Sequence, residues 1–432
     1  MMSVAIIAVL LIVTVGLLQF ALSNGTAAER DNAEMLAFQT AESALHRGLS
    51  VLHNSDVIDP SAVPTTSFAE NGGTGTYSAS LSGLVWTITG TGIVANPASP
   101  GNSIRRTVSL QRQLFVETSP LWQANYANTP ASCLTISNNA DWNAPLYVNG
   151  DLCLDNNVKF SGSSLQVEGT LSLNNGASVG TSAAPIAVAK LKGGCLPGPH
   201  ACSSADKVYA SSLTTVTDAL TKPPIDLPKW YARSKPGPLN PCTTGSFQFD
   251  DDGTMNGSRG TVTLDPNSSY TCRYDVGATT LGELSWNQPA RRLTIAGTVF
   301  IDGNIFISGS VRYQGRGVLY AFGTVTVSNS ARVCGVVGCD STWDPGTNLL
   351  VLVAGAASGT GFSVNNNAVY QGAAYARSNY SLANNAANWG PTVANQFSIA
   401  NNSGTYKAPG TLPPGAPGSD WALATVPGAW NG

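Results

Sequence analysis

Hydrophobic residues fill the start of the chain and then recur with a helical period. The segment from Val4 to Leu22 is apolar except at Thr14, Gly16 and Gln19. At about 1.5 Å per residue, a helix of this length nearly spans the hydrocarbon core of a bilayer. After a loosened point at Asn24-Gly25, apolar residues recur three and four positions apart, which predicts an amphipathic helix. They are Met35, Phe38, Ala41, Leu45, Leu49 and Leu52.

Residues 74–116 instead alternate between apolar and polar. The segments GTYSASLSG, LVWTITGTGIV and SIRRTVSLQRQLF are separated by residues that favour turns. This pattern predicts a three-stranded antiparallel sheet packed on the apolar stripe of the 28–54 helix. We interpret Arg105-Arg106 as protection of a sheet edge rather than as a basic contact point.

A six-residue repeat dominates 293–316. Glycine falls at positions 297, 303, 309 and 315, each preceded by two apolar residues two positions apart. The blocks 146–180 and 362–404 repeat similar short triplets. Triplets are too short for hairpin strands but suit the sides of a β-solenoid, whose coils hydrogen-bond to the coils above and below. We expect the glycines and the Asn runs 365–367 and 384–385 to form corners at positive φ. A β-sandwich is the alternative.

The short repeated triplets are absent between 195 and 290, and we interpret this segment as an insertion that covers the stacked coils. Its aromatic pair Trp230-Tyr231 is a possible contact for a sugar or nucleobase, or packs on the solenoid. The Pro/Gly-rich end of the chain is expected to be an extended tail pinned to the body by Trp421 and Trp430.

These patterns predict an α+β chain with a long N-terminal helix, a small antiparallel sheet and a large β-solenoid. The expected segments are the apolar half of the helix (1–24), its amphipathic half (25–58), the sheet (60–118), the first part of the solenoid (119–194), the disulfide-pinned insertion (195–290), the second part of the solenoid (291–410) and the tail (411–432).

Composition supports a β-rich extracellular protein. Of 432 residues, only 11% are charged, against roughly 25% in ordinary globular domains. Glycine is abundant at 45 residues. The net charge of −3 gives no global attraction to nucleic acid or anionic lipid, so such contact would need a local basic patch.

The eight cysteines suggest disulfides formed in an oxidising compartment. None forms a CxxC pair, and three histidines are too few for a zinc site. We expect neighbours in sequence to pair; buried free thiols are the alternative. The expected pairs are Cys133–Cys153, Cys195–Cys202, Cys242–Cys272 and Cys334–Cys339.

The N-terminal layout resembles a type IV pilin, and 28–45 resembles the N-terminal domain of PilX-type minor pilins. The matching residues are Glu29-Arg30, Asn32 and the run from Ala37 to Leu45. This resemblance implies a helix that inserts into the core of a pilus, next to other pilins, after removal of a leader. It makes Met1 the expected first mature residue. Many pilins have Glu at mature position five, where this chain has Ala5.

The stem residues expected to support assembly are Ala5, Gly16, Phe38, Ala41, Glu42 and Leu45. The alternative for this segment is a plain membrane anchor or an uncleaved signal. The glycine-punctuated blocks also resemble bactofilin-like and pilin-fused solenoids.

No catalytic motif is evident: HExxH, GxSxG, the P-loop and the Rossmann fingerprint are all lacking. We expect no enzyme activity and no cofactor. The densest acidic cluster is Asp250 to Asp252, directly before Gly253. Asp250 and Asp252 are weak candidates for binding Ca²⁺, and the alternative is a solvated turn.

The sequence therefore predicts a non-enzymatic minor pilin. It would reside in the bacterial inner membrane before assembly and then in an extracellular pilus, at the tip, supporting assembly and displaying the solenoid for adhesion or for a surface, glycan or DNA ligand. Binding of DNA would need a stripe of basic side chains on one face of the protein. The candidate arginines are Arg291, Arg292, Arg312, Arg316 and Arg332. The alternative is a membrane-tethered β-helix polysaccharide hydrolase or lyase.

Overall fold

The computed structural model describes residues 2–55, 57, 61–70, 72–99, 101–137, 140–234, 242, 254–276, 279–399 and 406–431. The chain forms two compact units. One combines Met1–Phe115 with Trp421–Gly432, and the other is Val116–Asp420. The chain therefore leaves the first unit once and returns to it near its C-terminal end.

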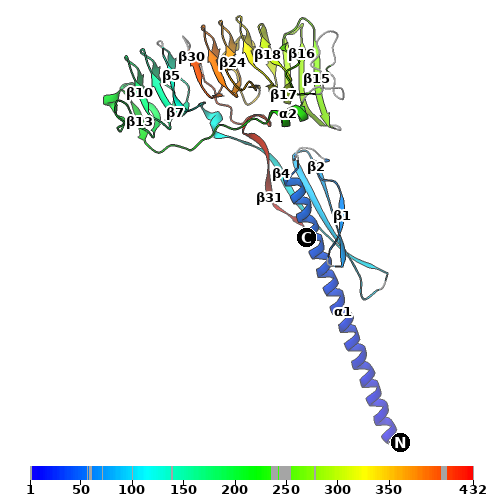
Figure 1. Cartoon of the computed structure of the whole chain (residues 1–432). Helices are drawn as coiled ribbons and strands as arrows, with labels where there is room; N and C mark the ends of the chain where they lie inside the picture. Colours follow the sequence, from blue (N-terminus) through cyan, green and yellow to red (C-terminus); the bar gives the residue numbers. More distant parts are fainter. Residues whose placement is uncertain are drawn as a thin grey trace. The chain divides into compact units, whose positions relative to one another are not determined.

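The first unit consists of one long helix and a five-stranded sheet (Figure 1). Helix α1 (Met2–His53) continues through Asn24-Gly25, so the expected loosened point does not interrupt it. The strands lie in the order β1-β2-β3-β4-β31, and the first four are antiparallel neighbours. They are β1 (Thr66–Glu70), β2 (Gly73–Ser82), β3 (Val85–Ala95), β4 (Ser103–Thr118) and β31 (Ser419–Asn431).

The C-terminal segment has two parts. Residues 411–418 pack on the solenoid, where Tyr320 donates its hydroxyl to the carbonyl of Gly415 at 2.7 Å, whereas β31 is a strand of this sheet. Strand β31 lies beside β4, and Trp421 packs against the core formed by α1 and the sheet. Trp430 is exposed. The expectation of a three-stranded sheet was therefore incomplete, because β1 and β31 extend it on its two sides.

The second unit is a β-solenoid with three-sided coils (Figure 1). One coil consists of β20 (Arg316–Ala321), β21 (Val325–Val327) and β22 (Arg332–Cys334). The next coil places β23 (Leu349–Ala354), β24 (Thr360–Val364) and β25 (Val369–Tyr370) in parallel register on these three sides. Such parallel stacking confirms the solenoid and excludes the β-sandwich, whose sheets are antiparallel.

The other strands of the first half of the solenoid are β5 (Asn125–Ile136), β6 (Asp141–Trp142), β7 (Leu146–Leu154), β8 (Lys159–Phe160), β9 (Ser164–Val167), β10 (Leu171–Leu173), β11 (Ser178–Val179), β12 (Ile186–Leu191) and β13 (Ala210–Thr214). Those of the second half are β14 (Thr261–Thr263), β15 (Tyr270–Val276), β16 (Thr279–Asn287), β17 (Arg292–Ile301), β18 (Asn304–Ile307), β19 (Ser310–Gln314), β26 (Ala373–Ala376), β27 (Asn379–Leu382), β28 (Ala387–Asn388), β29 (Thr392–Ala394) and β30 (Phe397–Ile399).

The two halves of the solenoid meet in its middle. The first half runs from β5 to β13, and the second runs from β14 to β30. On one side of the stack, β29 of the second half pairs in parallel with β5 through Val393–Tyr126 and Ala394–Ala127. We call this junction the seam. Segment 195–290 is more than an insertion, because β13 continues the stack on β12 and β14 pairs with β18. Strands β15, β16 and β17 pair antiparallel next to these coils.

The six-residue repeat builds the interior of the stack. Its eight apolar positions, Leu293, Ile295, Val299, Ile301, Ile305, Ile307, Val311 and Tyr313, are all buried in one core that runs through the solenoid. The glycines, however, have two different roles. Gly297 and Gly315 have positive φ, as expected for corners, whereas Gly303 and Gly309 do not. A Cβ at Gly303 would lie 2.6 Å from the carbonyl oxygen of Gly260, so this glycine is needed for close approach of the neighbouring coil.

Asparagine corners stack from coil to coil. Asn366, Asn367, Asn384 and Asn385 all have positive φ, while Asn365 does not. The Asn384 side chain donates from Nδ2 to Oδ1 of Asn366 at 3.0 Å, which joins two successive corners. The expectation of corners at positive φ is confirmed at these four positions and is wrong for Asn365.

The four disulfides join the cysteines that the sequence paired as neighbours. Cys133–Cys153 links β5 to β7 in adjacent coils. Cys195–Cys202 and Cys334–Cys339 close short loops, and Cys242–Cys272 ties a long connection to β15.

Candidate functional site

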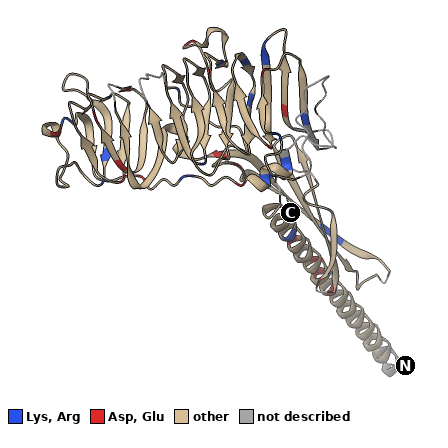
Figure 2. Cartoon of the chain, turned by 45° about the horizontal axis from the view of Figure 1, so that its top comes forward, with Lys and Arg blue, Asp and Glu red and all other residues tan. Residues whose placement is uncertain are grey.

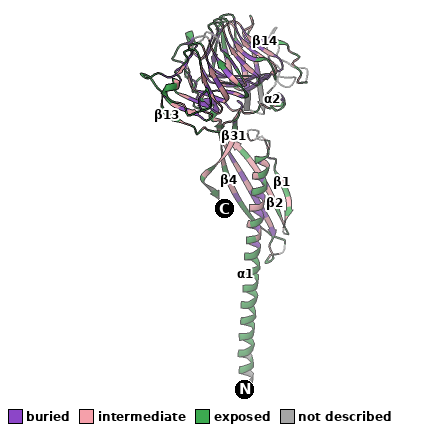
Figure 3. Cartoon of the chain, turned by 60° about the vertical axis from the view of Figure 1, so that its left-hand side comes forward, coloured by how far each residue is buried: buried purple, intermediate pink, exposed green. Residues whose placement is uncertain are grey.

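Helix α1 has two halves with opposite surroundings within its own unit (Figure 3). Large apolar side chains between Ile6 and Leu22 are exposed, with Leu17 at 64% and Phe20 at 65%. This half is long and apolar enough to cross a membrane. Gly16 is exposed, and Ala5 lies within the helix.

The second half of α1 is seated on the sheet. Ala41 and Leu45 are fully buried, Phe38 packs against the same core and Glu42 is partly buried. Above this seat, the carboxylate of Glu34 accepts hydrogen bonds from Arg106 of β4 and, at 3.2 Å, from Arg30.

Arg106 therefore has a specific contact on α1, and edge protection does not describe it. Its guanidinium, with that of Arg30, lowers the pKa of Glu34 below the usual value of 4.5.

The aromatic pair Trp230-Tyr231 packs on the solenoid and does not form an open surface for a ligand. Both residues lie on helix α2 (Leu227–Ser234). Trp230 stacks on Tyr320 at 5.6 Å between ring centroids, and Tyr231 meets the edge of Phe300 at 5.5 Å. Of the two alternatives left open by the sequence, packing therefore describes this pair.

Residues 215–234, which we call the strap, cross the outer surface of the solenoid over the seam. Tyr147 in the first half donates its hydroxyl to the carbonyl of Asp218 at 2.7 Å. Lys222 reaches the second half, where its Nζ donates to the carbonyl oxygens of Ala376 and Arg377 at 2.7 and 2.9 Å. The strap therefore fastens both halves together, which its sequence did not indicate.

Three arginines form a row on one side of the solenoid. Arg292 and Arg312 are direct neighbours on β17 and β19, and Arg332 lies on the next strand, β22, opposite Ser310. All three are exposed and alternate with buried residues. Adjacent strands lie about 4.8 Å apart, so Arg292 and Arg312 place two positive charges close together. Arg332 adds a third charge that is displaced by two residues along its strand. Charged residues are otherwise sparse on the solenoid (Figure 2).

Two other arginines of the expected stripe lie differently. Arg291 is next to the row, but its guanidinium is 3.9 Å from the carboxylate of Asp265, which is almost fully buried and whose pKa is raised by that burial. Arg316 begins β20 on another side of the coil, where it donates to the carbonyl oxygen of Thr411. Burial lowers the pKa of Arg316, and this residue does not join the row.

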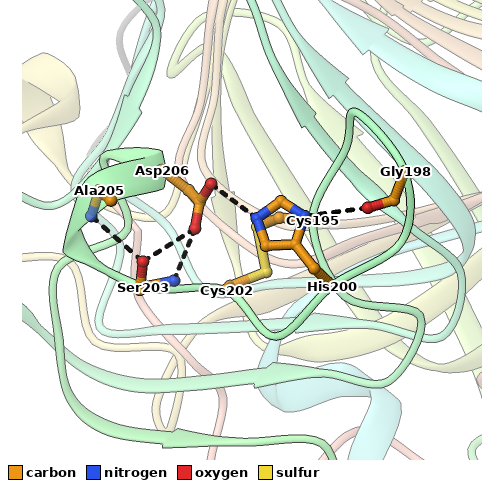
Figure 4. Close-up of a disulfide and its surroundings, with 7 residues drawn as sticks. All are labelled: Cys195, Gly198, His200, Cys202, Ser203, Ala205 and Asp206. Carbon is orange, nitrogen blue, oxygen red and sulfur yellow. Dashed lines mark hydrogen bonds and ion pairs between the residues drawn. A yellow bond between two sulfur atoms is a disulfide. The ribbon is translucent and has the colours of Figure 1, made fainter.

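The disulfide loop at Cys195–Cys202 brings a histidine, an aspartate and a serine together (Figure 4). His200 Nε2 lies 2.9 Å from Asp206 Oδ1, and Ser203 Oγ donates to Asp206 Oδ2 at 3.0 Å. The carboxylate lies between the other two side chains, whereas a catalytic triad needs the histidine in that place. This loop therefore does not activate Ser203 as a nucleophile.

The acidic turn expected to be a weak Ca²⁺ candidate, Asp250 and Asp252, lies outside the described residues. Within the described ranges, no three His, Cys, Asp or Glu side chains gather closely enough to hold a metal ion.

Two hollows border the seam. One of about 50 Å³ lies between the last coil of the second half and β6. The other, about 390 Å³ and more open, is lined by neutral side chains that include Asn128, Thr129 and Gln396. Asp141 beside the first hollow is the one carboxylate among the described residues that line the two.

No protein-family model matches the sequence, and no curated protein is significantly similar to it. Among solved structures, the chain is similar to the competence-associated pilin ComZ from Thermus thermophilus, with a TM-score of 0.44 and 12% sequence identity. The similarity covers 92% of this chain and 97% of the ComZ chain.

Proposed function

We propose that this protein is a non-enzymatic subunit of a type IV pilus, a minor pilin that supports assembly and displays its solenoid at the filament tip. The observation that carries the proposal is the division of α1 into an exposed apolar half and a half seated on an antiparallel sheet. The apolar half would reside in the inner membrane before assembly and among the helices of other pilins afterwards.

Exposed apolar side chains on this scale need a non-aqueous partner. From Val4 to Leu22 the helix rises by about 28 Å, close to the ~30 Å thickness of a hydrocarbon core. A membrane supplies such surroundings, and so does a bundle of similar helices.

A continuous helix also suits a filament better than a plain anchor does. An anchor needs no rigid link to the domain it holds, whereas here one helix runs from the apolar half into the seat on the sheet. The size of the second unit, Val116–Asp420, supports the tip position, because so large a body would pack poorly in many copies along a filament.

The alternative, a membrane-tethered polysaccharide hydrolase or lyase, requires two or three carboxylates close together in a groove. The two seam hollows offer a single carboxylate between them among the described residues, Asp141. This favours the non-enzymatic role.

The proposal is tested by shearing filaments from cells and measuring the chain in the filament and membrane fractions. Gly16→Leu keeps the helix apolar but adds bulk at an exposed position with open space around it. We expect an unchanged membrane fraction and a several-fold lower filament fraction, with Leu11→Ile as the matched control. Absence of the wild-type chain from filaments of an assembling strain would instead indicate a plain anchor.

A second candidate function is contact with DNA through the arginine row. Three exposed guanidinium groups on neighbouring strands are suited to phosphate oxygens, and nearby acids are few. This contact would be local, since the chain as a whole is slightly acidic.

A further inference from the structure

The solenoid wall is interrupted at the seam. The side containing β29 and β5 continues across it. On the other two sides, the described residues show no strand pairing between β30 and β5 or between β28 and β6. The smaller hollow lies at this interruption, and Trp142 of β6 and Asn388 of β28 both line it. The chain topology therefore opens the interior at one defined place.

The lining of this hollow contains polar atoms without partners. The hydroxyls of Tyr380 and Tyr406 and the Oδ1 of Asn388 are buried and make no hydrogen bond to any residue that the structure describes. Tyr380 is only 2% exposed; Thr392 lies near its hydroxyl without a hydrogen bond of good geometry. Each unsatisfied buried group costs about 1–3 kcal/mol, so three around one hollow indicate a missing partner.

The chemistry of the lining defines that partner. Among the described lining residues there is no Lys or Arg, which argues against an anion. The polar groups are amides and hydroxyls, with the Asp141 carboxylate at the margin, and Trp142 supplies an aromatic surface. Hydroxyl groups can both donate to and accept from such groups, while the C–H face of a sugar ring packs on an aromatic ring.

We propose that the seam hollow is a binding site for the end group of an uncharged carbohydrate. A volume of about 50 Å³ accommodates about three to five water-sized groups, at roughly 10–15 Å³ each. It therefore takes the hydroxyl-bearing edge of one terminal sugar and not the middle of a chain. The site deepens the proposed display function by naming a ligand class, but binding itself does not depend on filament assembly.

The test uses the full chain in a zwitterionic detergent, because glycoside detergents would compete for the site. The probes are the methyl glycosides of glucose, galactose, mannose and N-acetylglucosamine, and binding is measured by saturation-transfer NMR. We expect saturable binding of at least one probe. Tyr406→Phe removes one unpartnered hydroxyl and should weaken that binding roughly tenfold. Tyr209→Phe, outside the hollow, is the matched control.

Trp142→Ala should abolish binding, but Trp142 also packs on Phe397, so its folding must be checked by thermal unfolding. Tyr406→Phe keeps the proposal testable if the tryptophan variant fails to fold. If none of the four probes binds to the folded chain, the hollow holds water and the proposal is wrong. Binding that both Tyr406→Phe and Trp142→Ala leave unchanged would also overturn it. Neither result bears on incorporation into filaments, which the Gly16 variant tests separately.

Discussion

Gly92 of β3 lies directly against Ala37 of α1. A Cβ at Gly92 would overlap the carbonyl oxygen of Ala37, and one at Gly90 would overlap that of Ala41. The two glycines are on the same face of the strand, since they are two residues apart. They form a track that lets the helix backbone approach the sheet closely, which the fully buried Ala37 and Ala41 also require.

Gly92→Ala is therefore expected to push α1 away from the sheet and to destabilise the first unit by about 1–3 kcal/mol, the usual cost of overpacking. The measurement is thermal unfolding of the full chain in detergent. Gly25→Ala on α1 is the matched control, because a Cβ there meets nothing within 4 Å and alanine favours the helix. Equal stability of the two variants would show that the track is not needed.

Features encoded locally could be predicted from the sequence. Helix α1 follows from an uninterrupted apolar run and a three-four spacing, and the solenoid from repeated triplets. The Cys133–Cys153 pair and the other disulfides join sequence neighbours. In each case, the relevant residues are close in the chain.

Long-range relationships could not be predicted. Strand β31 joins a sheet whose other strands lie some three hundred residues earlier, and its Pro427-Gly428 suggested a tail. The seam needs β29 to meet β5, and no periodicity indicates which coils become neighbours. One signal was missed: Gly90 and Gly92 alternate on one face of a predicted strand, which indicates close backbone approach.

The two roles of the repeat glycines can be separated by substitution. Gly303→Ala should destabilise the solenoid by about 1–3 kcal/mol, because its Cβ would meet the backbone of the neighbouring coil. Gly359 has a φ of +67° with open space around it, so Gly359→Asn should change stability by less than about 0.5 kcal/mol. Calorimetric unfolding of both variants checks this, and a harmless Gly303→Ala would contradict the crowding argument.

The loop of Figure 4 is expected to be most stable at mildly acidic pH. The carbonyl of Gly198 and the carboxylate of Asp206 raise the pKa of His200 above 6.5. This stabilisation is present below 6.5 and is lost as pH rises through the raised pKa. His200 and Ser203 lower the pKa of Asp206 below 3.8, so its contribution is present above 3.8 and is lost as pH falls through the lowered pKa.

Hydrogen exchange of residues 196–207, corrected for the intrinsic rate, measures this effect. Protection should be greater at pH 5.5 than at pH 8, values chosen below about 6.5 and well above it. His200→Gln should remove the difference, and His53→Gln on α1 is the control. A pH dependence that survives in His200→Gln would assign it to another group.

DNA contact through the arginine row predicts a salt-dependent affinity with a defined slope. Filter binding of the full chain to duplex DNA across a salt series gives the logarithmic slope, and each lost phosphate contact reduces it by about 0.9. Combined replacement of Arg292, Arg312 and Arg332 by Ala should therefore lower the slope by about 2 to 3. Arg105→Ala, exposed in the other unit, is the control and should change nothing.

The triple variant is expected to stay folded, and thermal unfolding checks this. Arg292 and Arg312 are like charges on adjacent strands, so their removal should leave stability unchanged or slightly raise it. Arg316→Ala should have the opposite effect. This half-buried residue donates to the carbonyl oxygen of Thr411, so its loss should lower stability without changing the salt dependence of DNA binding. Retention that does not depend on salt, or a slope that the triple variant leaves intact, would remove the arginine row from any role in DNA contact.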